Sequence, residues 1–99
     1  MKVVKDRSWQ IAVSERIVQG RTALGRSQAN VAKALGISAQ RLSNYENGSR
    51  PLDIGLAIIL CERFGLTLDY LYRGKVYGLP SELADKIGVI RIPEGALRN

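Results

Sequence analysis

The chain has 99 residues, of which 45% are hydrophobic and 24% are charged, and this balance predicts a single globular domain with one core. Fifteen lysine and arginine residues against nine acidic residues give a net charge of +6, which suits a polyanion such as nucleic acid or an acidic membrane. The chain has no histidine and one cysteine, which excludes histidine-based catalysis, histidine-ligated metals and an internal disulfide. We therefore expect a cytoplasmic protein that needs no cofactor and is not an enzyme.

The first predicted helix begins at Ser8, and its end lies between Gln19 and Leu24, because Gly20 weakens any longer helix. Its apolar stripe has helical spacing and consists of Trp9, Val13, Ile17 and Leu24. Further helices are expected over residues 28–35, 39–47, 54–64, 68–73 and 80–87. The sequence therefore predicts five or six short helices.

The boundaries of these helices rest on capping residues. Side chains that can accept a hydrogen bond from the first turn precede four of the helices, namely Ser27, Ser38, Asp53 and Thr67. Glycines that can adopt a left-handed conformation follow the same helices, namely Gly36, Gly48, Gly65 and Gly74. Pro80 suits the first turn of the last helix.

No long strand pattern occurs before residue 88, so the expected fold class is all-α. We divide the chain into a flexible basic arm (1–7), a main helical domain (8–74) and a C-terminal helix with a tail (75–99) that is a candidate for dimerisation. Residues 88–99 are expected to be a tail or a short edge strand. The apolar run at 89–92 packs on its own domain or forms a dimer.

The helices at 28–35 and 39–47 form a tight corner around residues 36–38. Ala32 is small enough for the two axes to approach, and Gly36 can turn the chain with a positive φ. Leu42 and Tyr45 then face the core from the second helix. This spacing is what a helix-turn-helix requires.

The opposite face of the second helix carries polar side chains without charge: Gln40, Ser43, Asn44 and Asn47. An ordinary solvated face favours lysine, glutamate and arginine. Amides instead present a donor and an acceptor side by side, which matches the edge of adenine in the major groove. The alternative interpretation is a polar surface helix. All of the net positive charge lies in residues 1–50, around this pair of helices.

Glu46 falls beside Leu42 on the inner side of the second helix, where a carboxylate needs a partner. Arg21, at the end of the first helix, is the best candidate. We hypothesise a largely buried Arg21–Glu46 ion pair that fixes the second helix against the first. The alternative is a solvent-exposed glutamate.

The pattern resembles the phage-repressor/Cro type of helix-turn-helix domain, the XRE family, over about residues 12–74. The residues that carry the resemblance are Arg26-Ser27-Gln28, Val31-Ala32, Leu35-Gly36-Ile37-Ser38, Leu42 to Gly48, Arg50-Pro51, and Leu60 with Phe64-Gly65-Leu66 and Leu68 to Leu71. The resemblance implies a compact five-helix lambda-repressor-like domain whose third helix enters the major groove. Here a short C-terminal helix and tail would be added.

The resemblance also implies roles for single residues. Base-reading residues would be Ala39, Gln40, Ser43 and Asn44, with a phosphate contact as the alternative for Ser43. Phosphate-binding residues would be Gln28, Ser38, Arg41, Asn47 and Arg50. An Arg21–Glu46 pair fits a recurrent feature of the family. The sequence departs from the pattern at Arg26, where an apolar residue is usual, and at Gly20, where leucine is common, so the first helix could be loosened.

Several further side chains have two interpretations each. We expect Cys61 to pack in the core rather than to react. Of Tyr70 and Tyr72, one is expected in the core and the other at a dimer interface. The basic arm, with Lys2, Lys5 and Arg7, is either a frayed terminus or a contact to a phosphate or to the minor groove of DNA.

The sequence therefore predicts a sequence-specific regulator of transcription that binds double-stranded operator DNA as a homodimer, with repression as the expected action. The alternative on the same fold is an antitoxin or anti-repressor module whose main partner is a protein. A peptide bound to a membrane surface is disfavoured, because the charges do not share a face with a Trp/Leu-rich stripe.

Overall fold

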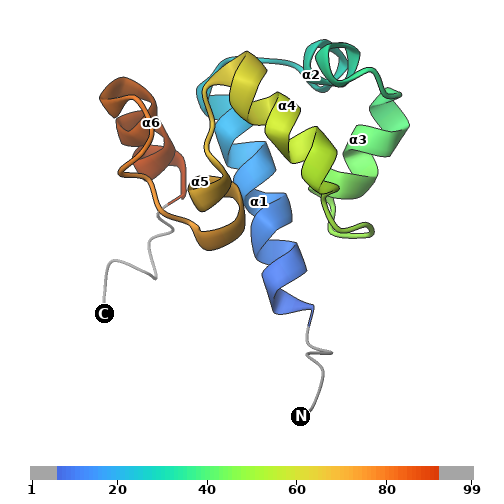
Figure 1. Cartoon of the computed structure of the whole chain (residues 1–99), viewed down its shortest axis with the longest axis horizontal. Coiled ribbons are helices and arrows are strands. Elements are labelled where there is room, and N and C mark those ends of the chain that lie inside the picture. The colour runs from blue at the N-terminus through green and yellow to red at the C-terminus, as the bar shows by residue number, and fades with distance from the viewer. Residues whose placement is uncertain (1–6, 92–99) are drawn as a thin grey trace.

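The structure is a computed structural model, and it describes residues 7–91 (Figure 1). This range holds no strand and consists of α1 (Ser8–Ala23), α2 (Gln28–Leu35), α3 (Ala39–Glu46), α4 (Ile54–Phe64), α5 (Leu68–Arg73) and α6 (Ser81–Arg91). The predicted all-α class is confirmed. No helix within the described part of the chain has both the length and the apolar character that crossing a bilayer requires.

Helix α1 is the centre of the fold. It contacts α3, α5 and α6, while α2 packs on α3 and α4. Figure 1 shows α3 and α6 on opposite sides of α1. The core between these helices includes the fully buried side chains of Ile17, Leu42, Tyr70, Leu71 and Ile87. One continuous core therefore supports the corner formed by α2 and α3.

The predicted caps set the ends of the middle helices. The Ser27 and Ser38 hydroxyls each accept a hydrogen bond from the backbone N–H three residues later, at 3.0 Å. The Asp53 and Thr67 side chains do the same for α4 and α5. Left-handed glycines end α2, α4 and α5. Helix α3 ends at Glu46, one residue earlier than expected, and Asn47 is its C-cap.

Helix α1 ends at Ala23, within the expected range of Gln19 to Leu24, and it continues through Gly20 without being loosened there. Gly20 is buried against α5 and the link before it, and a Cβ there would lie 3.2 Å from Leu66 Cδ2. The glycine therefore allows close packing. The expected apolar stripe is also only partly inside, since Val13 and Ile17 are buried whereas Trp9 is 49% exposed.

The C-terminal helix is longer than expected. Helix α6 covers Ser81–Arg91, so the tail or edge strand predicted from residue 88 is wrong for residues 88–91. Leu83 and Ile87, one turn apart, are buried in the core, and α6 packs on α1. This docking outweighs the cost of Gly88 inside a helix, about 1 kcal/mol. Residues 92–99 and the side chains of residues 89–91 lie outside the described part, so the proposed dimer role of 89–92 stays a prediction.

The two tyrosines of α5 differ in burial. Tyr70 is fully buried, and its hydroxyl donates to the Arg16 carbonyl at 2.8 Å. Tyr72 is half-buried and donates to the Leu52 carbonyl at 3.1 Å. Cys61 packs against the core, and burial, with the Glu62 carboxylate as a second cause, raises the pKa of its thiol. One tyrosine and the cysteine thus have the predicted core positions.

Candidate nucleic-acid interface

The α2–α3 corner has the geometry that its sequence predicts. Gly36 has φ of 72°, and the Ile37 N–H donates to the Ala32 carbonyl at 3.0 Å, which closes the end of α2. Ala32 is 2% exposed between the two helices. Leu42 and Tyr45 are 1% and 2% exposed and hold α3 to the core. Because the inward face is fixed, the residues of the opposite face of α3 must point to solvent.

This outward face carries the residues predicted to read bases. Ala39 and Gln40 are exposed, and Ser43 and Asn44 are half-exposed. The Gln40 Nε2 group donates to Asn44 Oδ1 at 3.2 Å, so the two amides lie side by side one turn apart. These four residues therefore form one uncharged surface that offers several hydrogen-bond donors and acceptors.

Arg41 and Ser38 flank the start of this face. The Arg41 guanidinium lies over the Tyr45 ring at 5.8 Å from its centroid, and its Nε donates to the Tyr45 hydroxyl at 3.2 Å. Arg41 is exposed, so its charge still reaches solvent. The Ser38 hydroxyl caps α3 by accepting from the Arg41 N–H. Both residues keep polar atoms near the N-terminus of α3.

Asn47 and Arg50 lie in the turn after α3 and are exposed. Asn47 Oδ1 accepts from the backbone N–H of Ser49 at 2.9 Å and from its hydroxyl, which shapes the turn. The Arg50 N–H donates to the Asn44 carbonyl at 3.2 Å. The side chain of Arg50 is thereby carried at the edge of the α3 face.

Two side chains of the α1 end tie this turn to the rest of the domain. Gly48 has φ of 83°, and its carbonyl accepts from Gln10 Nε2 at 2.7 Å and from Arg7 Nη2 at 3.1 Å. Gln10 was not identified from the sequence as a residue that holds the turn. Its position one turn before Val13, in the predicted apolar stripe, was the available signal that its side chain faces inward. The assignment of Arg7 to a flexible arm is wrong, because Arg7 is the N-cap residue of α1 and contacts Gly48. Residues 1–6 of that arm, with Lys2 and Lys5, lie outside the described part.

Arg21 and Glu46 form the ion pair expected from the sequence. Arg21 Nε donates to Glu46 Oε2 at 2.7 Å and Nη2 donates to Oε1 at 3.1 Å. The Glu46 side chain is 5% exposed and that of Arg21 is 19% exposed. Gln28 Nε2 also donates to Glu46 Oε1, at 2.8 Å. The amide predicted to bind phosphate thus also joins the start of α2 to the end of α3.

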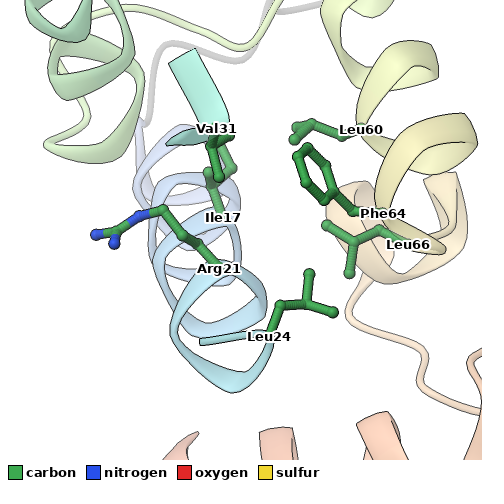
Figure 2. Close-up of a pocket in the computed structure, with 7 residues that line it drawn as sticks. All are labelled: Ile17, Arg21, Leu24, Val31, Leu60, Phe64 and Leu66. Atoms are coloured by element: carbon green, nitrogen blue, oxygen red, sulfur yellow. The ribbon is translucent and has the colours of Figure 1, made fainter. Parts of the chain in front are cut away.

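A shallow apolar hollow, open to solvent, lies behind this network, between α1, α2 and α4 (Figure 2). Its lining residues are Ile17, Arg21, Leu24, Val31, Leu60, Phe64 and Leu66. Figure 2 shows the Arg21 guanidinium pointing away from the hollow, so Arg21 contributes its aliphatic stem there. Within the described residues, no cluster of three or more His, Cys, Asp or Glu side chains could hold a metal.

Comparison with known proteins agrees with this geometry. A family model described as "Helix-turn-helix" matches residues 17–71, which is more than half of the chain. The chain is 33% identical over 75 residues to the HTH-type transcriptional regulator PrpR of Mycobacterium tuberculosis (strain ATCC 25618 / H37Rv). That match covers 73% of this chain but 15% of the length of the regulator. No solved structure matches the chain. The chain belongs to the helix-turn-helix family of the phage-repressor/Cro (XRE) type.

Proposed function

We propose that this protein is a sequence-specific regulator that binds double-stranded DNA by inserting α3 into the major groove. The observation that carries the proposal is the side-by-side arrangement of the Gln40 and Asn44 amides, 3.2 Å apart, on the outward face of α3. In the groove, each amide can exchange this contact for the donor and acceptor edge of adenine. Ala39 and Ser43 complete the base-reading surface, the alanine through contact with a thymine methyl group.

Residues around this face would bind the phosphates. Arg41 and Arg50 are exposed on either side of it, and Ser38 and Gln28 lie at the starts of α3 and α2. Asn47 lies in the turn after α3. Because the whole positive excess of the chain is in residues 1–50, the affinity should depend on neutralised phosphates and fall steeply with salt.

Two copies would bind one operator, and occupation of the operator would repress transcription. Half-sites read by a symmetric pair of such domains are spaced by about 34 Å. Ile54 and Ile58, one turn apart on α4, are 55% and 43% exposed and offer apolar surface to a second copy. Light scattering of the free and DNA-bound protein gives the stoichiometry, and a single copy on a full palindrome would contradict the dimer.

Selection of bound duplexes from random DNA tests the base-reading role. The selected duplex and a shuffled duplex of equal composition are then titrated with the protein and its variants. Gln40→Ala and Asn44→Ala should each lose about 1–3 kcal/mol of preference for the selected duplex. Arg50→Ala should weaken both duplexes alike, because phosphates carry no sequence information.

The matched control is Lys75→Ala, since this exposed lysine lies in the link after α5 and should affect neither duplex. If the amide variants lose both duplexes equally, the base-reading assignment is wrong. If the selection yields no preferred sequence, the protein-binding alternative, an antitoxin or anti-repressor, is favoured instead.

A further inference from the structure

Arg26 departs from the family pattern, and the structure gives its charge a defined place. It is exposed and precedes Ser27, the cap of α2. Its guanidinium lies over the Phe64 ring, with Cζ 5.6 Å from the centroid, and Nη1 donates to Asn30 Oδ1 at 3.3 Å. A stacked guanidinium loses less conformational freedom when it binds an anion than a free one does.

The backbone of Arg26 is tied to the end of α3. Arg21 Nη1 donates to the Arg26 carbonyl at 2.9 Å, while the other nitrogens of the same guanidinium bind Glu46. Glu46 is the last residue of α3 and immediately precedes Asn47. Gln28, two residues after Arg26, contacts Glu46 as well. The backbone of Arg26 is therefore joined, through Arg21 and Glu46, to the part of the domain that carries Gln28 and Asn47.

Within residues 7–91, the ion pairs Arg21–Glu46 and Arg73–Asp69 do not include Arg26. Asn30 gives Arg26 a neutral acceptor only. A role confined to covering Phe64 needs no charge, because an apolar side chain would do this without desolvating a guanidinium. A stacked cation just before the start of α2, with no ion-pair partner among residues 7–91, is suited to a DNA phosphate.

We propose that Arg26 binds a DNA phosphate in addition to those bound by the other residues of the interface, and that Phe64 is its positioning residue. This inference rests on the proposed DNA-binding function. It concerns affinity for any sequence, since a phosphate contact does not distinguish bases.

The test is the salt dependence of binding to the selected and the shuffled duplex, measured for the whole chain and its variants. Arg26→Leu should reduce the slope of log K against log salt by about 0.9 and weaken both duplexes by roughly 5- to 10-fold at low salt. Arg26→Gln should reduce the slope and the affinity in the same way, and it replaces Arg26→Leu as the test if the leucine variant folds poorly. The control Lys86→Leu removes one exposed positive charge from α6, across α1 from α3 (Figure 1), and should leave the slope unchanged.

The positioning role of Phe64 has a separate readout. Arg26→Lys and Phe64→Leu keep the charge but remove the stacking, so the slope should stay and the affinity should fall by about 2- to 3-fold. Circular dichroism at the assay temperature verifies that each variant is folded. A slope for both Arg26→Leu and Arg26→Gln equal to that of the wild type would overturn the inference while leaving the proposed function intact. Failure of the wild-type protein to bind either duplex would instead overturn the proposed function, and the inference with it.

Discussion

Glu46→Gln tests whether the Arg21–Glu46 pair holds the DNA-facing helix in place. The substitution keeps the size of the side chain and removes its charge. In the native protein, the two Glu46 oxygens accept from Arg21 at 2.7 and 3.1 Å and from Gln28 at 2.8 Å. Glutamine has one oxygen, so its amide nitrogen must face at least one of these donors.

The expected loss of unfolding free energy is about 2 kcal/mol. Breaking a fully buried ion pair by removing one partner costs about 3–5 kcal/mol. Here the Glu46 side chain is 5% exposed, but that of Arg21 is 19% exposed and can still reach water, which lowers the cost. The donor left without an acceptor costs about 1–3 kcal/mol. Both estimates point to the same range.

The assay is urea unfolding followed by circular dichroism, with the midpoint and the m-value compared between variants. A lower midpoint at an unchanged m-value is the expected result. The matched control is Asp69→Asn, which breaks the Arg73–Asp69 pair, whose side chains are 63% and 44% exposed. This control should lose less than about 0.5 kcal/mol. If Glu46→Gln changes stability by no more than this control, the pair does not fix α3 and the reasoning fails.

Three further predictions follow from packing, capping and burial. Gly20→Ala should lower the unfolding temperature, because the added Cβ would lie 3.2 Å from Leu66. Gly88→Ala meets no described atom within 4 Å and should raise the unfolding free energy by about 0.5–1 kcal/mol. Equal effects of the two substitutions on stability would contradict this account. Ser38→Ala should cost about 1 kcal/mol in urea unfolding by removing the cap of α3, and an unchanged midpoint would show the cap to be dispensable. The Cys61 thiol should be alkylated at pH 8 more slowly in the folded protein than in urea, because burial raises its pKa and less thiolate is present; similar rates would refute this.

The sequence predicts the structure correctly where a feature depends on residues that are near one another in the chain. The cap at Ser27 and the left-handed turn at Gly36 depend on residues within one turn, so the bounds of α2 could be read from the sequence. The role of Gly20 could not, because it is set by Leu66, which lies far along the chain. The same holds for Gln10, whose partner Gly48 is 38 residues away. The ion pair of Glu46 was accessible because a carboxylate on an inward helical face demands a cation.

The residues that hold α3 in position differ from the residues that α3 presents to solvent. Its C-terminal end is joined to α1 through Arg21, and the following turn is joined to α1 through Gln10. Gln40 and Asn44, in contrast, form a hydrogen bond with each other across an open face. A change in α1 should therefore displace α3 as a whole and alter affinity for every DNA sequence together. A change at the two amides should alter sequence preference at little cost in stability, since exposed substitutions usually stay within about 0.5 kcal/mol. The basic excess and the uncharged amides thus serve different purposes, affinity in one case and selectivity in the other.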